Sequence, residues 1–137
     1  MSGRGHRPLE HTADLAVELW APDEASLLVE GARALVELLT DGAELHGSAE
    51  RPVELEALDP EDRLVRWLGE VLFLASTEGF LVTDAALELA GSSLRGTMRG
   101  EPGATARLRS EIKAVTYHDL QLTRGPEGYR ARVVFDV

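Results

Sequence analysis

Residues 59–94 read DPEDRLVRWLGEVLFLASTEGFLVTDAALELAGSSL, and the spacing of their apolar side chains changes at Gly79. Before Gly79 the spacing is helical, with Asp59 as an N-cap and Pro60 at the first helical position. Acidic residues in the first turn suit the positive end of the helix dipole, and glycine commonly ends a helix. After Gly79 apolar and polar side chains alternate, which predicts two strands joined by a turn at residues 91–93. The helix stripe consists of Leu64, Val65, Leu68, Val71, Leu72 and Ala75, and the strands carry Leu87 and Leu89, then Leu94 and Met98.

The segments on either side of this region extend the same pattern of strands and helices. Upstream, apolar residues at every second position predict a strand, and Asp23 then begins a helix that ends at Thr40-Asp41-Gly42, with Gly42 as its cap. The order of elements predicts an α+β protein with a single domain over residues 1–137. Two helices are expected to pack on one face of a mainly antiparallel or mixed β-sheet. The remaining strands are predicted from Ala13, Leu15, Val17 and Leu19, from Val53, Leu55 and Ala57, and from the segments Ile112–Tyr117, Leu120–Thr123 and Tyr129–Val137.

The composition limits the functions that this chain can have. Its 14 basic and 24 acidic residues give a formal net charge of −10, which repels nucleic-acid phosphates, so we expect direct nucleic-acid binding to be weak or indirect. Because the chain has no cysteine, disulfides, iron–sulfur clusters and zinc–thiolate sites are excluded. Residues 1–8 are polar, and no stretch approaches the roughly 18 apolar residues of a membrane span, so we expect a cytoplasmic protein.

Two aspartates near the chain ends are candidate ligands for a metal ion. Asp14 lies on the polar face of the first predicted strand, and Asp136 lies on the polar face of the last one. If those strands are neighbours, the two carboxylates converge beside the α-carboxylate of Val137. Such oxygen ligands suit the hard cations Ca²⁺ and Mg²⁺. Spacing alone favours the alternative that each aspartate is simply solvated, because exposed aspartate is common.

Other polar residues give little support for catalysis. Asp41 lies in a helix-ending turn, where aspartate is favoured for backbone reasons. The histidines show no zinc-hydrolase spacing, and His11 and Asp14 would point to opposite faces of a strand. No serine stands in a nucleophile elbow, and no glycine loop of a nucleotide-binding type is present. The case for catalysis from these residues is therefore weak.

Basic residues gather in the second half of the chain. Lys113 alternates with apolar neighbours, so we expect it to project from a strand. A local basic group of this kind could meet an acidic partner or RNA, and an ordinary solvated strand face explains it equally well. The other members of the group are Arg95, Arg99, Arg107 and Arg109.

Six short motifs become recognisable when they are taken together. They are HTAD at 11–14, LTD at 39–41, WL at 67–68, EG at 78–79, EIKAVTYH at 111–118 and VFDV at 134–137. In this order they extend over nearly the whole chain, which resembles the archease family. The runs at 11–14 and 111–118 are the specific ones. The chain departs from the family pattern at Gly69, where relatives often carry Asn, and at Pro8-Leu9, which replaces a more aromatic segment.

The resemblance implies a function in RNA joining. Archeases are accessory proteins of the RNA ligase that joins a 2′,3′-cyclic-phosphate or 3′-phosphate end to a 5′-hydroxyl end, and they promote its guanylylation and turnover. By resemblance, this chain would activate an RNA-splicing ligase in transfer-RNA splicing or RNA repair. The family's metal ligands correspond to Asp14, Asp136 and Val137, a further essential acid to Asp41, and the activating lysine to Lys113. The cation would be Ca²⁺ or Mg²⁺, with Mn²⁺ and Zn²⁺ as further candidates.

Two other functions remain open at this point. A stand-alone metal-dependent nuclease or phosphatase also needs clustered aspartates, together with a basic substrate cleft. A general protein chaperone needs an exposed apolar patch. Neither function requires a ligase, so the purified protein tested alone on RNA would separate the nuclease from the accessory protein.

Overall fold

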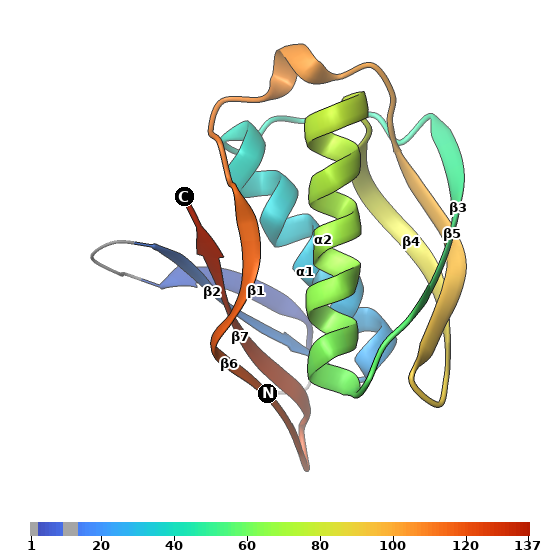
Figure 1. Cartoon of the computed structure of the whole chain (residues 1–137), viewed down its shortest axis with the longest axis vertical. Helices are drawn as coiled ribbons and strands as arrows, with labels where there is room; N and C mark the ends of the chain where they lie inside the picture. Colours follow the sequence, from blue (N-terminus) through green and yellow to red (C-terminus); the bar gives the residue numbers. More distant parts are fainter. Residues whose placement is uncertain (1–2, 10–13) are drawn as a thin grey trace.

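The computed structural model describes residues 3–9 and 14–137, in which two α-helices and seven strands form (Figure 1). The strands make two antiparallel sheets, a four-stranded sheet in the order β1-β2-β7-β6 and a three-stranded sheet in the order β3-β5-β4. The predicted α+β class with antiparallel pairing is confirmed, although the strands form two sheets and not one. The elements are β1 (Gly5–Leu9), β2 (Leu15–Ala21), α1 (Glu24–Thr40), β3 (Ala49–Glu56), α2 (Pro60–Glu78), β4 (Leu81–Ala90), β5 (Ser93–Glu101), the 3₁₀ turn η1 (Thr105–Arg107), β6 (Ala114–Gly125) and β7 (Gly128–Asp136).

Both helices begin and end close to the predicted residues. Asp23 caps α1 and Asp59 caps α2, each accepting a hydrogen bond of 2.8 Å from the backbone N–H three residues later. Gly79 ends α2 in the left-handed conformation, at φ 66°. At the end of α1 the prediction of Gly42 as the cap was wrong, because Asp41 itself takes the left-handed conformation, at φ 55°. Aspartate tolerates that conformation better than most residues, and Gly42 then continues the turn at φ 76°.

The helices lie between the two sheets and share one core with both of them (Figure 1). Trp67 of α2 is fully buried, and its indole N–H donates a hydrogen bond of 2.6 Å to the carbonyl oxygen of Leu28 in α1. The four-stranded sheet contributes Phe135 to this core and the three-stranded sheet contributes Leu94, both at 0% exposure. Each such side chain stabilises the fold by about 1.5–3 kcal/mol.

Two features of the four-stranded sheet differ from the sequence prediction. β1 was not predicted, since its polar residues and Pro8 hide the strand signal; Pro8 is tolerated because β1 is an edge strand. The segments expected as two separate strands, before and after residue 118, belong to the single strand β6. The pairing of β6 with β7 shifts between Thr116 and Gln121, and Asp119 takes φ 51° there, so the break in the apolar pattern marks a bulge.

Candidate functional site

The start of β2 and the end of β7 lie side by side in the four-stranded sheet. The strands are antiparallel, and Leu15 of β2 pairs with Phe135 of β7. Asp14 precedes Leu15 and Asp136 follows Phe135, so the two aspartates stand at adjoining strand ends. Phe135 faces the core, and alternation along the strand directs Asp136 to the opposite face. Asp14 is half-buried and Asp136 is exposed. The first and last predicted strands are therefore neighbours, as the metal hypothesis requires. His11, Thr12 and Ala13 of the HTAD motif lie outside the described residues.

A third segment, the one that leads into β6, reaches the same edge of the sheet. Ala114 pairs with Asp136, and the backbone N–H of Lys113 donates a hydrogen bond of 2.7 Å to the carbonyl oxygen of Asp136. Lys113 is exposed and stands one residue before β6, not inside a strand as predicted. Among the described residues its ammonium group forms no ion pair. Asp136 and Val137 are exposed as well. Lys113 and Asp136 are therefore both accessible to solvent at the same strand end.

Asp41 stands at the end of α1, which is bonded to the segment that precedes Lys113. The carbonyl oxygen of Leu39 accepts hydrogen bonds from the backbone N–H groups of Arg109, at 2.7 Å, and Ser110, at 3.2 Å. Asp41 is therefore two residues from a contact with that segment. Within the described part of the chain, no hydrogen bond or ion pair joins its carboxylate to the other candidate residues. The last turn of α1 carries no basic residue, so the negative charge of Asp41 lies at the negative end of the helix dipole without local compensation.

The donors at this sheet edge fit part of a hard-cation site. Asp14 and Asp136 supply carboxylate oxygens, and main-chain oxygens of Asp136 and Val137 lie beside them. In residues 3–9 and 14–137, no three His, Asp or Glu side chains are close enough to hold a metal ion by themselves. Since Ca²⁺ takes six to eight oxygen ligands and Mg²⁺ usually keeps several waters, water or a partner would complete the shell. The donor set fits such a cation chemically, and it is an incomplete set.

The basic group predicted around Lys113 is dispersed in the structure. Three of its arginines form ion pairs with glutamates, at 3.6 Å for Arg95 with Glu88, 2.8 Å for Arg99 with Glu50 and 3.3 Å for Arg107 with Glu101. Arg109 instead donates to the carbonyl oxygens of Ala106 and Leu108. Arg95 and Arg99 lie on β5 of the three-stranded sheet, whereas Lys113 leads into β6 of the four-stranded sheet.

Sequence reasoning missed a contact that fixes β6 against α2. The Tyr117 hydroxyl donates a hydrogen bond of 2.5 Å to Asp62, a buried residue in the first turn of α2. Asp62 also accepts hydrogen bonds from the Arg66 guanidinium, at 2.7 Å, and from the backbone N–H of Leu58, at 2.8 Å. These bonds, that of Tyr117 first, lower the pKa of Asp62 to about 2. Nothing in the sequence spacing joins residues 62 and 117, so no local pattern could have shown this contact.

A second polar cluster joins β1 to α1. His6 lies between two glutamates of α1, with Nδ1 at 2.9 Å from Glu30 and Nε2 at 2.7 Å from Glu37. Glu30 also binds Arg4, at 2.7 Å, and Arg33, at 3.1 Å. Burial alone would lower the pKa of His6, but its hydrogen bonds to the two glutamates outweigh burial and raise that pKa. The seven-residue spacing of Glu30 and Glu37, which places both on one helix face, is the sequence signal that was overlooked.

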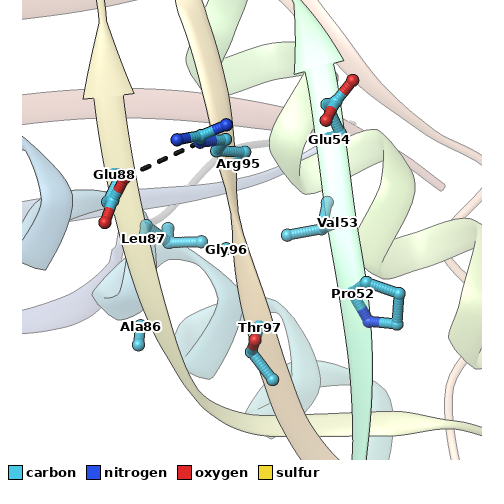
Figure 2. A pocket seen from close by; sticks show the side chains of 9 residues that line it. All are labelled: Pro52, Val53, Glu54, Ala86, Leu87, Glu88, Arg95, Gly96 and Thr97. Atoms are coloured by element: carbon cyan, nitrogen blue, oxygen red, sulfur yellow. Dashed lines mark ion pairs between the residues drawn. The ribbon is translucent and has the colours of Figure 1, made fainter.

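A hollow of about 740 Å³ lies on the three-stranded sheet, around Gly96 (Figure 2). Val53 and Leu87 point toward Gly96 from the two flanking strands, with which it pairs in register. Gly96 lies close to the neighbouring strand, because a Cβ there would lie 2.0 Å from the carbonyl oxygen of Ala86. The charged groups at its rim include the ion pair of Glu88 and Arg95, and the predicted site residues are elsewhere.

Comparison with known proteins identifies the family. A model of the Archease protein family (MTH1598/TM1083) matches residues 6–137. The chain belongs to the archease family. The archease of Methanopyrus kandleri is 38% identical over 135 residues, which cover 94% of this chain and 96% of the relative.

Solved archease structures have the same fold. The solution structure of Methanobacterium thermoautotrophicum protein 1598 superposes with a TM-score of 0.80 at 30% identity and covers 100% of both chains. The crystal structure of TM1083 from Thermotoga maritima, described as an archease, possible chaperone, gives a TM-score of 0.66 at 28% identity over 96% of each chain. In the described part of this archease, no helix is both long and apolar enough to cross a membrane.

Proposed function

We propose that this archease is an accessory protein that activates an RNA-splicing ligase, promoting its guanylylation and turnover in transfer-RNA splicing or RNA repair. The observation that carries the proposal is the meeting of three chain segments at one edge of the four-stranded sheet. There Asp14, Asp136 and Lys113 end or begin neighbouring strands, two of them exposed. Family membership supports the same assignment.

In this proposal Asp14 and Asp136, with a main-chain oxygen of Val137, hold a divalent cation, Ca²⁺ or Mg²⁺, in contact with the ligase. A bound cation would supply a positive centre for the nucleotide phosphates of the partner. A cation held by only these few protein ligands would keep coordination positions for a partner. The carboxylates would orient the cation, and the pairing of Leu15 with Phe135 places the two aspartates at adjoining strand ends.

Lys113 is the second active element of the proposal. Its backbone is fixed by the hydrogen bond to Asp136, whereas its ammonium group is exposed and forms no ion pair with a described residue. A free ammonium group binds a phosphate or a carboxylate of the partner, and it does not ligate a cation. Asp41 lies at the end of α1, where the carbonyl oxygen of Leu39 is bonded to the segment that precedes Lys113. Asp41 would therefore contact the same partner.

The test is ligation and ligase guanylylation with the cognate ligase at limiting concentration, so that turnover is visible. We expect wild-type protein to increase both, and Lys113→Ala to abolish the increase without changing cation affinity. Arg95→Ala is a matched control, because it removes an exposed cation from the other sheet. Equal stimulation by Lys113→Ala and wild type would refute the assignment of Lys113. The same assay without ligase tests for nuclease activity.

Of the two alternative functions, the chaperone is supported by the description of TM1083 as a possible chaperone. A nuclease of the two-metal type needs more clustered carboxylates than Asp14 and Asp136. A chaperone surface needs contiguous apolar area, and the large exposed apolar side chains of the described residues are those of Leu58, Phe73, Tyr117 and Val137.

A further inference from the structure

The four-stranded sheet has an outer face, on the side away from both helices (Figure 1). The cross-strand pairs on this face contain an excess of arginine. Arg7 of β1, Glu18 of β2 and Arg132 of β7 form one row across three strands, because Arg7 pairs with Glu18 and Glu18 pairs with Arg132. In the next row Trp20 of β2 pairs with Arg130 of β7. We call these five side chains the arginine face.

Charge on the arginine face is unbalanced. Glu18 is its one carboxylate, and it contacts Arg7 at 3.0 Å and Arg130 at 3.3 Å. The side chains of Arg7 and Arg130 are nevertheless 61% and 55% exposed. The Nε of Arg132 is buried and has no hydrogen-bond partner among the described residues. Glu127 of the adjoining turn also interacts with Arg130, which leaves three guanidinium groups against two carboxylates on a chain whose net charge is −10.

An indole stands beside these arginines. Trp20 is half-buried and packs against Gly5, where a Cβ would lie 2.5 Å from the ring; its Nε1 is buried and has no hydrogen-bond partner among the described residues. Trp20 also lines a hollow of about 450 Å³ near the β6–β7 turn, together with Tyr129 and Arg130. The second tryptophan, Trp67, is buried in the core with its N–H bonded, so Trp20 is the tryptophan that a ligand can reach.

We propose that the arginine face binds single-stranded nucleic acid, with arginines on successive phosphates and one base against the indole of Trp20. Exposed arginines next to an aromatic ring on an open sheet face are the combination that such ligands use, since every base has a face that stacks and every nucleotide has a phosphate. An acidic peptide would use the guanidinium groups and leave the ring without a partner. The hollow is of a size that admits a small ring system.

This inference goes beyond the activation of a ligase and does not depend on it. Trp20 and Arg130 lie about 17 Å along the strands from the Leu15–Phe135 pair, at about 3.4 Å per residue, so the arginine face and the candidate cation site occupy different ends of the same sheet. The net negative charge of the chain predicts weak binding of nucleic acid to the protein surface in general. The arginine face would be a local positive area at which such binding occurs.

The test uses the purified full-length protein and a fluorescein-labelled oligouridylate of about eight nucleotides, measured by anisotropy at low salt. We expect Arg7→Gln/Arg130→Gln to weaken binding about tenfold and to flatten the dependence on salt. Both side chains are more than half exposed, so the fold should be retained. Arg95→Gln/Arg99→Gln, which makes the same charge change on the three-stranded sheet, should bind like wild type. Equal affinity of the two double variants would overturn the proposal.

Tryptophan fluorescence provides the second measurement. Unlabelled oligonucleotide should quench the emission of wild type, and Trp20→Leu should remove the quenching because Trp67 is out of reach. An oligoglutamate peptide of equal charge should compete poorly. If the peptide competes as well as unlabelled RNA does, or if the quenching persists in Trp20→Leu, nucleic acid is not the specific ligand of this face.

Discussion

The hydroxyl of Tyr117 donates a hydrogen bond of 2.5 Å to the carboxylate of Asp62, joining edge strand β6 to the first turn of α2. Tyr117 lies shortly after Lys113, so this bond helps to fix the segment from which that lysine projects. Burial of Asp62 is tolerated because Arg66 and the backbone N–H of Leu58 bind its second oxygen.

Acid should destabilise the protein through Asp62. The folded-state pKa of Asp62, about 2, is below its ordinary value of 3.8, so its contribution is complete above about pH 4 and is lost as pH falls toward 2. Urea unfolding at several pH values should show this loss in wild type and a smaller one in Asp62→Asn, which is less stable at pH 7. Tyr117→Phe, which removes one bond and keeps Arg66, should be intermediate. Identical acid dependence in all three proteins would exclude Asp62 as the cause.

Alkaline pH should weaken the attachment of β1 through His6. Its pKa is raised above 6.5 by Glu30 and Glu37, so the stabilisation is complete below about pH 6.5 and is lost as pH rises through the folded-state pKa. Amide exchange in β1 should therefore accelerate between pH 6 and 8.5 by more than the intrinsic rate increase. His6→Gln should remove that excess. An unchanged excess in His6→Gln would assign it to another group.

Asp41→Asn should make the protein more stable and less active. Asparagine accepts the left-handed conformation that Asp41 adopts at φ 55°, and it removes a negative charge from the negative end of α1. The gain should be about 0.5 kcal/mol in the free energy of unfolding. Asp23→Asn, at the opposite end of the same helix, is the control and should be destabilising or neutral. Ligase stimulation should fall in Asp41→Asn alone. A stabilised variant with full stimulation would give Asp41 a purely structural role.

Asp14→Ala and Asp136→Ala should each weaken Ca²⁺ binding by about 10–100-fold. Both residues are outside the core, so thermal unfolding should change little. Calorimetric titration measures the affinity, with Asp84→Ala as a control, since Asp84 is 57% exposed and lies on the three-stranded sheet. Isotherms that match wild type in both variants would remove the cation from the proposed mechanism.

Local features of the fold were predictable from the sequence, and non-local ones were not. Asp59 and Gly79 mark the ends of α2 because a cap acts on backbone groups within one turn. The alternation of apolar and polar residues around Asp14 and Asp136 indicated that both lie on polar strand faces. Their adjacency follows once β2 pairs with β7. The Asp62–Tyr117 bond, the edge strand β1 and the division into two sheets depend on contacts between distant segments, which no spacing along the chain encodes.

The pairing of β2 with β7 has a consequence for how the protein is made. Glu18 and Arg130, which contact each other across these strands, are 112 residues apart in the chain. During synthesis β2 leaves the ribosome early, and its second neighbouring strand, β7, is absent until the end of the chain has been made. Pairings of such long range form slowly, because closing a large loop costs entropy before contacts repay it. Helices α1 and α2 can form during this delay, whereas the two aspartates become neighbours only at its end. A polypeptide cut short before β7 would therefore keep helical segments, Asp14 and Lys113, but it would lack Asp136 and could not assemble the candidate site.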